Sequence, residues 1–213
     1  SRTRITAVHP LWAVEGGRIT LDGSDFTLSG GDLPEVRVGT GVARVVHASP
    51  NALSILVPPG LDGGHTAVRV EGTLGETAFI ELGVPIATGL HQVDNPIIDR
   101  AGCVYLTYSG ARGQRAAVSI FRVQPDGTRE SFVSGITNPT SMTFDGRGRL
   151  YVSSRFEGAV YRIGADGSFE MVAADLGVAC GLAYDADGSL YVGDRSGTIF
   201  RVSSTGHTTA FAT

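Results

Sequence analysis

The stretch Asp145-Gly-Arg-Gly-Arg-Leu-Tyr-Val-Ser153 decides the fold, because the chain contains two further copies of its pattern. The other copies are Asp99-Arg-Ala-Gly-Cys-Val-Tyr-Leu-Thr107 and Asp185-Ala-Asp-Gly-Ser-Leu-Tyr-Val-Gly193. Each is followed by an aromatic-Arg-aliphatic run, whose aromatic residues are Phe121, Tyr161 and Phe200. A period near 40 residues with several short strands per repeat is typical of a β-propeller blade. The sequence therefore predicts three blades in residues 85–213.

The first 84 residues follow a different pattern, in which short β-type runs alternate with Gly- and Pro-rich turns. Apolar and polar residues alternate within the runs, as in Ile19-Thr20-Leu21 and Val36-Arg37-Val38. Seven such runs predict a β-sandwich over residues 1–84. The predicted strands are Ile5–Val8, Arg18–Leu21, Val36–Val38, Arg44–His47, Leu53–Val57, Ala67–Val70 and Thr77–Leu82.

Both halves resemble known families. Pro10, Gly16-Gly17, Ile19-Thr20-Leu21 and Val57-Pro58-Pro59-Gly60 resemble the immunoglobulin-like IPT/TIG family. That resemblance implies a module of cell-surface, bacterial extracellular or transcription-factor proteins. The repeat Asp-x-x-Gly-x-Leu-Tyr-Val resembles NHL repeats and the propellers of the regucalcin and gluconolactonase type. The expected fold is all-β: an immunoglobulin-like sandwich followed by a partial, three-blade propeller.

Three blades leave a propeller incomplete, since known propellers have typically four to eight. Stacking on neighbours is what buries the faces of such repeats. Three interpretations follow: a longer protein with further blades, two chains that complete a six-bladed ring, or an accessory subunit docked on a larger assembly.

Composition excludes several classes of function. All 17 basic residues are Arg and the formal net charge is −4, so no positive field favours nucleic acid. The absence of Lys removes lysine-based catalysis. The apolar runs are too short for a membrane-spanning helix. Cys103 and Cys180 are not at zinc-ligand spacing, and a disulfide between them is left open.

A metal site is expected only from the resemblance to lactonase-type propellers, which hold a divalent ion on acidic and amide residues ahead of their innermost strands. The equivalent positions, five residues before each repeat aspartate, are Asp94, Thr140 and Cys180. Only Asp94 is a suitable ligand, whereas calcium takes six to eight oxygens. No cofactor is predicted, and calcium at Asp94 is kept as an alternative. The Asp-Gly pairs at Asp126 and Asp166 and the Asp187-Gly188 pair are interpreted as hairpin turns.

Arginines supply the candidate partner-binding residues. Arg122, Arg162 and Arg201 recur at one position of the repeat, where they either bind an acidic partner or lie outward over apolar neighbours. The aligned pairs Ser154-Arg155 and Asp194-Arg195 are expected in loops at one mouth of the propeller. The tyrosines of the repeats are expected in the blade core. Trp12 lies either exposed at the tip of the sandwich, as an adhesive residue, or as a cap on its core, and the cap is favoured.

These features favour a non-catalytic binding or scaffold protein outside the cytoplasm, of bacterial type, which contacts a protein or glycan through a propeller face. The alternative is a metal-dependent lactonase or hydrolase with most of its ligands outside this chain. No Ser-His-Asp arrangement can be argued from the sequence, which argues against a catalytic triad. Whether the chain is an enzyme is left open, and a non-catalytic role is favoured.

Overall fold

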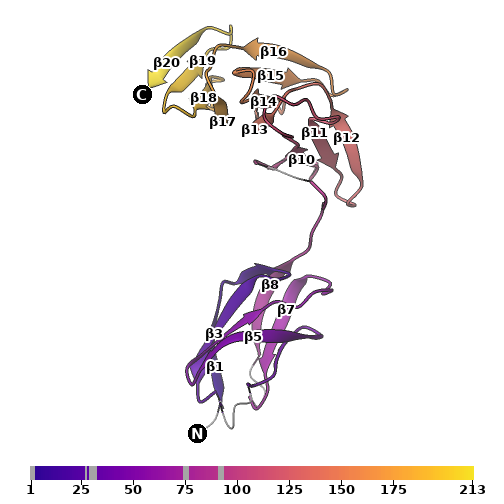
Figure 1. The fold of residues 1–213 in the computed structure, drawn as a ribbon, viewed down its shortest axis with the longest axis vertical. Coiled ribbons are helices and arrows are strands. Elements are labelled where there is room, and N and C mark those ends of the chain that lie inside the picture. The colour runs from indigo at the N-terminus through magenta and orange to yellow at the C-terminus, as the bar shows by residue number, and fades with distance from the viewer. Residues whose placement is uncertain (1–2, 27, 29–32, 74–76, 91–93) are drawn as a thin grey trace. The chain divides into compact units, whose positions relative to one another are not determined.

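The computed structural model describes residues 3–26, 28, 33–73, 77–90 and 94–213. The chain divides into two compact units, Ser1–Pro85 and Ile86–Thr213 (Figure 1). The described residues form β-strands and contain no helix, so the predicted all-β class is confirmed. Within those same ranges, no helix is long and apolar enough to cross a membrane.

The N-terminal unit is built on one sheet of eight strands in the order β1-β3-β6-β5-β4-β7-β8-β2. Strand β5 pairs with β4 through its first residues and with β6 through its later ones, so it belongs to both halves of the sheet. The strands are β1 (Arg4–His9), β2 (Trp12–Val14), β3 (Arg18–Ser24), β4 (Val36–Val38), β5 (Gly41–Ser49), β6 (Ala52–Leu56), β7 (Gly64–Val70) and β8 (Ala78–Gly83).

Alternation of apolar residues places one face of these strands in a single core. Ile19 and Leu21 of β3 are fully buried, as are Leu53 and Ile55 of the neighbouring β6. The cluster joins both halves of the sheet, since Val36, Val38, Val68 and Ile80 belong to it as well. The seven predicted strands lie where β1 and β3–β8 are found.

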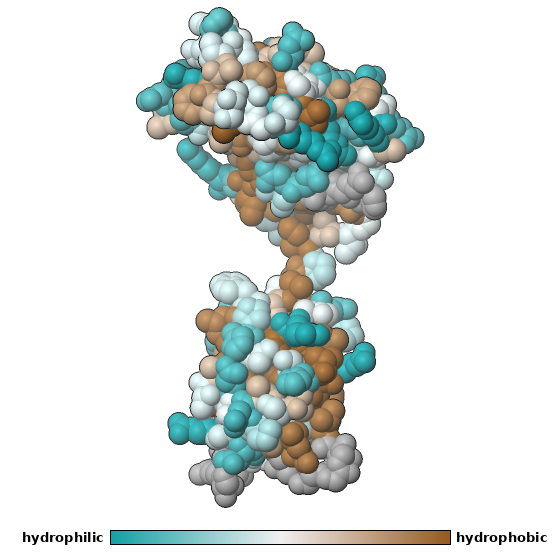
Figure 2. All heavy atoms as spheres, turned by 60° about the vertical axis from the view of Figure 1, so that its left-hand side comes forward, coloured by the Kyte–Doolittle hydropathy of each residue, from teal (hydrophilic) through white to brown (hydrophobic). Residues whose placement is uncertain are grey.

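Strand β2, which contains Trp12, was not predicted. β2 is an edge strand that pairs in parallel with β8, with Trp12 opposite Glu81. Ala13 packs on the core, and Trp12 therefore lies on the outer side with 74% of its surface exposed. The expectation that Trp12 caps the core is wrong, because the edge strand turns its small residue inward. Figure 2 shows hydrophobic atoms on the surface of this unit.

The C-terminal unit contains three antiparallel sheets of four strands each, called here the first, second and third sheet. Their order along the chain is also their order in space, with the second sheet between the other two (Figure 1). The first sheet has β9 (Ile97–Ile98), β10 (Val104–Thr107), β11 (Ile120–Val123) and β12 (Arg129–Val133). The second has β13 (Pro139–Phe144), β14 (Leu150–Ser154), β15 (Ala159–Ile163) and β16 (Phe169–Ala173). The third has β17 (Ala179–Tyr184), β18 (Leu190–Asp194), β19 (Ile199–Val202) and β20 (Thr208–Ala212).

The repeat aspartate closes the turn between the first two strands of each sheet. Asp145 Oδ1 accepts hydrogen bonds from the amides of Arg147 and Arg149, both at 2.9 Å. Its other oxygen accepts from the Tyr151 hydroxyl at 3.3 Å. Asp99 makes the equivalent bonds to two amides and to Tyr105, while Asp185 accepts from the Ser189 amide. The repeat pattern is therefore a turn motif, and in the first two sheets it also ties the aspartate to the tyrosine six residues later.

Two hydrophobic clusters hold the three sheets together. One lies between the first and second sheets around Ile120, Met142 and Val152. The other lies between the second and third sheets around Val160, Leu176 and Val192. Tyr105 and Tyr151 are buried in these clusters as expected for the repeat tyrosines, whereas Tyr191 of the third sheet is only half-buried.

Candidate functional site

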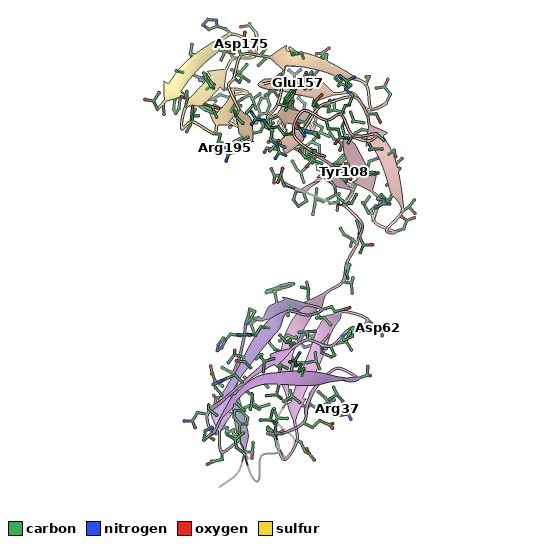
Figure 3. The ribbon with its side chains drawn as sticks, in the orientation of Figure 1. Arg37, Asp62, Tyr108, Glu157, Asp175 and Arg195 are labelled. Atoms are coloured by element: carbon green, nitrogen blue, oxygen red, sulfur yellow. The ribbon has the colours of Figure 1, made fainter. Side chains whose placement is uncertain are left out.

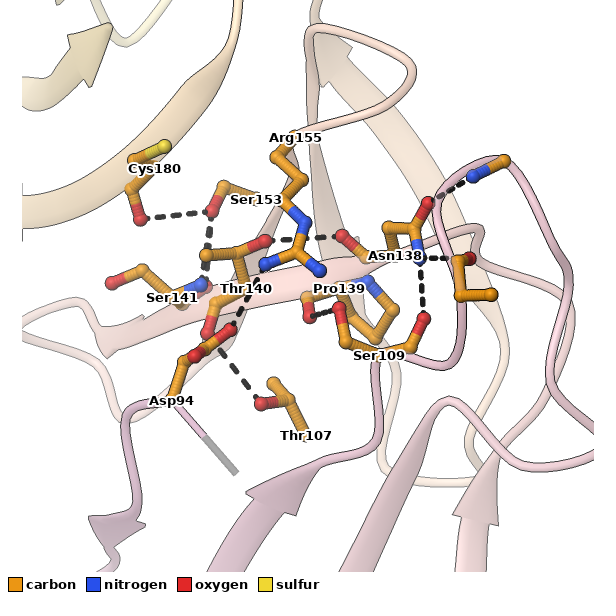
Figure 4. Close-up of polar contacts among 12 residues, drawn as sticks. Asp94, Thr107, Ser109, Asn138, Pro139, Thr140, Ser141, Ser153, Arg155 and Cys180 are labelled. Carbon is orange, nitrogen blue, oxygen red and sulfur yellow. Dashed lines mark hydrogen bonds and ion pairs between the residues drawn. The ribbon is translucent and has the colours of Figure 1, made fainter. Parts of the chain in front are cut away.

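One end of the three sheets brings together residues from all three repeats. The Ser141 hydroxyl at the start of β13 accepts hydrogen bonds from Asn95 Nδ2 at 3.0 Å and from the Leu182 amide at 3.2 Å. The Ser153 hydroxyl accepts from the Ser141 amide at 3.0 Å and reaches the Cys180 carbonyl at 3.4 Å (Figure 4). This hydrogen-bonded network fixes the beginnings of the inner strands β13 and β17. We call this end of the three sheets, with the loops that follow β14 and β18, the loop end.

Asp94 and Arg155 meet at the loop end, although 61 residues separate them in the sequence. Arg155 Nη1 lies 3.4 Å from Asp94 Oδ2, and the two side chains remain 30% and 39% exposed (Figure 4). Arg155 follows β14, and its backbone amide donates to the Asn138 carbonyl at 3.3 Å. The contact therefore joins the segment before β9 to the loop after β14.

Arg195 occupies in the third sheet the place that Arg155 has in the second. Its amide donates to the Val178 carbonyl at 3.1 Å, which repeats the bond from Arg155 to Asn138. Its side chain is exposed, and within the described ranges no carboxylate is in ion-pair distance of it. Figure 3 labels Arg195 at this end of the third sheet. Two guanidinium groups thus emerge from equivalent loops.

The carboxylate of the neighbouring Asp194 already accepts hydrogen bonds from nearby residues. Its Oδ1 accepts from the Val178 amide at 2.6 Å, and its Oδ2 accepts from the Ser196 hydroxyl and amide. The Ser196 hydroxyl and these amides hold the pKa of Asp194 below its usual range. The carboxylate thus stays ionised and fixes the loop that presents Arg195.

The other three candidate arginines lie on the sheets, away from the loop end. Arg122 Nε lies 2.7 Å from Glu130 Oε1, and Arg162 forms an ion pair with Glu170 on the adjacent strand. The Arg122 guanidinium also lies over the Phe132 ring, 4.5 Å from its centroid. Arg201 donates to the Ser189 hydroxyl at 2.9 Å and is exposed.

The positions that would hold a metal do not form a cation site. Thr140 Oγ1 donates to the Asn138 carbonyl at 3.1 Å, and Cys180 is a free, half-buried thiol. Only Asp94 supplies a carboxylate, which the Arg155 guanidinium already faces. Outside the omitted segments 1–2, 27, 29–32, 74–76 and 91–93, no three His, Cys, Asp or Glu side chains gather. These residues do not fit calcium, which needs six to eight oxygen ligands.

The Asp-Gly pairs form turns. Asp126 Oδ1 accepts from the Thr128 amide at 2.8 Å, and Asp166 Oδ1 accepts from the Ser168 amide at 3.0 Å. Gly127, Gly167 and Gly188 all have φ near +80°, the left-handed region in which glycine is favoured.

The two cysteines are separate thiols. Cys103 is buried, and its Sγ lies 3.1 Å from Gln124 Oε1. Burial raises the pKa of the Cys103 thiol, which lowers its reactivity.

Asn138 holds the structure of the loop end, and sequence reasoning missed it. Its side chain is fully buried with φ at +46°, and it holds the long loop between β10 and β11. Its Nδ2 donates to the carbonyls of Ser109 and Ala111, and its Oδ1 accepts from the Gly113 amide at 2.6 Å (Figure 4). The available signal was the Asn138-Pro139 pair directly before the inner strand, at a turn-forming position.

Two family models match parts of the chain. The family model described as "IPT/TIG domain" matches residues 3–79, which confirms the resemblance predicted for the first 84 residues. The model "Strictosidine synthase-like, N-terminal" matches residues 181–202, from β17 to β19. No curated protein matches the sequence significantly.

Solved structures resemble the chain at low identity. An auxiliary nutrient binding protein from Bacteroides ovatus is 11% identical with a TM-score of 0.49, over 100% of this chain and 71% of that one. A second such protein, from Bacteroides thetaiotaomicron, is 14% identical with a TM-score of 0.49, over 100% and 59%. A catalytically inactive virginiamycin B lyase from Staphylococcus aureus is 14% identical with a TM-score of 0.49, over 99% and 56%. The chain thus spans only part of each of these proteins.

Proposed function

We propose that the chain is a non-catalytic binding or scaffold module that contacts an acidic glycan or protein through the loop end of its three sheets. The observation that supports this most strongly is the pair of repeat-equivalent arginines, Arg155 and Arg195. Guanidinium groups bind carboxylates through two parallel hydrogen bonds. Both loops are anchored by backbone hydrogen bonds, so little conformational entropy is lost when they meet a partner.

In this proposal, residues 1–84 form an immunoglobulin-like sandwich that acts as a spacer. Residues 85–213 form three blades of a propeller, and the ring is completed by other blades. We place the module outside the cytoplasm, as in the cell-surface and bacterial extracellular branches of the IPT/TIG resemblance, because the net charge of −4 argues against the DNA-contacting transcription-factor branch.

The carboxylates of the loop end support binding rather than catalysis. Asp194 receives donors from its own turn, Asp94 faces Arg155, and Glu157 accepts from the Tyr161 hydroxyl at 2.7 Å. Burial and this bond to Glu157 raise the pKa of Tyr161 to about 12, so its hydroxyl stays a proton donor at neutral pH. These three carboxylates therefore act as structural acceptors that hold the loops in place.

The test is a titration of the chain with polygalacturonate and polyglutamate, against neutral dextran as the control polymer. One acidic polymer is expected to bind, with an affinity that falls as salt rises. The double variant Arg155→Ala/Arg195→Ala should lose about tenfold or more in affinity, the equivalent of one unit in log Kd. Arg147→Ala, an exposed arginine in the turn at the opposite end of the second sheet, is the matched control.

Equal binding by the double variant and the wild type would contradict the proposal. So would a lack of binding to either acidic polymer. Hydrolysis of a lactone that stops on addition of a chelator would support the metal-dependent alternative instead.

A further inference from the structure

An aromatic and acidic group of side chains lies on the outer face of the N-terminal unit, where β2, β8 and β7 run side by side. Trp12 is opposite Glu81 in the parallel pair of β2 and β8, and His65 is opposite Glu81 in the antiparallel pair of β7 and β8. Phe79 lies two residues before Glu81 on β8 and therefore projects from the same face. We call these four residues the tryptophan face.

Contacts within the sheet hold the tryptophan face in place. His65 Nδ1 lies 2.9 Å from Glu81 Oε1, which orients the carboxylate. The His65 ring also stacks on the Phe79 ring, with 4.6 Å between the ring centroids and 8° between the ring planes. The Glu81 amide donates to the Leu11 carbonyl at 2.7 Å, which joins β8 to the start of β2. A ligand that binds here therefore has few side chains to order.

The rings and the carboxylate of the tryptophan face are open to solvent within this unit. Trp12 and Phe79 have 74% and 45% of their surfaces exposed, and the Glu81 side chain is 39% exposed. Aromatic residues are enriched at protein interfaces, because they provide a large contact area with few rotatable bonds. The tryptophan face thus offers a partner two aromatic rings and one negative charge.

The charge of Glu81 determines which partner fits. An anionic group would be repelled, and an apolar one would bury the carboxylate without a counter-charge, which is costly. A guanidinium group fits both features, because its plane stacks on an indole ring while its edge donates two parallel hydrogen bonds to a carboxylate. Each carboxylate oxygen has about two acceptor sites, so Glu81 Oε1 can still accept a bond beside His65.

Arg69 is an exposed cation on the same face of β7, four residues along the strand from His65. At about 3.4 Å per residue, this is a separation of about 13 Å. The Debye length at physiological salt is about 8 Å, so Arg69 repels a cation at Glu81 only weakly.

We propose that the tryptophan face binds an arginine side chain of a partner protein, with the guanidinium group on the Trp12 ring and its hydrogen bonds to Glu81. In the proposed function the N-terminal unit is only a spacer, so this contact is an additional one. It shares neither residues nor ligand with the loop end.

Fluorescence of Trp12, the only tryptophan of the chain, measures this binding directly. The full chain is titrated with a synthetic peptide of alternating arginine and glycine, and with a matched peptide in which citrulline replaces every arginine. Citrulline keeps the planar end of the side chain but has no charge. The arginine peptide should change the fluorescence until saturation, with an affinity at least about tenfold higher than that of the citrulline peptide.

Two variants test the residues that make the contact. Glu81→Gln keeps the size of the side chain and removes its charge, and it should weaken binding of the arginine peptide by about tenfold or more. Trp12→Ala, measured by calorimetry, should lose a similar factor. Glu71→Gln removes the same charge at another exposed position of this unit and is the matched control, which should bind as the wild type does. Circular dichroism checks that all three variants are folded.

Equal affinities for the two peptides would overturn the inference, as would equal binding by Glu81→Gln and the wild type. Weak acrylamide quenching of Trp12 before any peptide is added would also overturn it, because the tryptophan face would then be covered already. A fluorescence change on addition of cellohexaose, with none from the arginine peptide, would make the face a sugar-binding surface instead. Binding of the arginine peptide without binding of acidic polymers would remove the proposed function and leave this inference standing.

Discussion

The ring of Tyr151 in the second sheet lies 4.8 Å from the ring of Tyr184 in the third, and this pair joins one repeat to the next. The Tyr151 hydroxyl donates a hydrogen bond to Asp145, which fixes the position of the Tyr151 ring. Burial and the Tyr151 hydroxyl raise the pKa of Tyr184, so the contact stays uncharged. The repeat aspartate thus organises the turn of its own sheet and also fixes the tyrosine on which the following sheet packs.

Replacement of Asp145 tests that role. Asp145→Ala removes the acceptor of two amides, of Arg149 Nε at 2.6 Å and of the Tyr151 hydroxyl. The variant should lose about 2–3 kcal/mol of unfolding free energy, since hydrogen bonds to a charged group are strong and their donors are left unpaired. Urea unfolding of the C-terminal unit measures the loss. Asp185→Ala, which removes the acceptor of the Ser189 amide, should cost less. Equal costs would show that the additional bonds of Asp145, to Arg147, to Arg149 Nε and to Tyr151, contribute nothing.

Acid should destabilise the C-terminal unit. Burial alone would raise the pKa of Asp145, but the backbone amide and guanidinium of Arg149 and the Arg147 amide reverse the effect and hold this pKa below its usual value. A carboxyl with a lowered folded-state pKa contributes stability above its unfolded pKa, about 3.9 for Asp, and loses it as the pH falls through the folded pKa. Asp126, Asp166 and Asp194 are shifted in the same direction. Thermal unfolding between neutral pH and pH 3 should therefore show a falling Tm, with a smaller fall in Asp145→Asn.

Loss of the Asn138 side chain should release the loop between β10 and β11. Asn138→Gly keeps the positive φ but removes three hydrogen bonds, at a cost of about 2 kcal/mol. Asn138→Ala should cost about 1 kcal/mol more, because an L-residue with a Cβ is strained in this region. Hydrogen exchange at Gly113 should accelerate in both variants. Unchanged exchange would mean that other contacts hold the loop.

The exposed position of Trp12 predicts a neutral substitution. Trp12→Ala should change stability by no more than about 0.5 kcal/mol, as surface changes usually do. Leu53→Ala in the core of the same unit should cost about 3 kcal/mol. Because Trp12 is the only tryptophan, quenching of its fluorescence by acrylamide is a direct readout. Quenching much weaker in the folded than in the unfolded chain would place Trp12 in the core after all.

The repeats could be predicted from sequence because each one encodes its own turn and strands. The spacing of Tyr105, Tyr151 and Tyr191 locates β10, β14 and β18, and the Asp-Gly pairs mark the hairpins. Strand β2 was missed because its three residues, Trp12-Ala13-Val14, are all apolar and show no alternation, unlike those of the equally short β4. The exposure of Trp12 depends on the pairing of β2 with β8, which lies almost 70 positions later in the chain.

The loop end could be predicted only in part. Arg155 and Arg195 were found by alignment of the repeats, but the contact of Arg155 with Asp94 joins different repeats and leaves no local pattern. The role of Asn138 also depends on a loop that is longer in the first repeat than in the others. Such contacts are set by how the sheets stack, which spacing within one repeat does not encode.

Titration with acidic polymers tests the central claim most directly, namely that Arg155 and Arg195 at the loop end bind carboxylates. The account predicts that polygalacturonate or polyglutamate binds the wild type, and that Arg155→Ala/Arg195→Ala binds it about tenfold more weakly, while Arg147→Ala binds it as the wild type does. Equal affinities of the double variant and the wild type would contradict it.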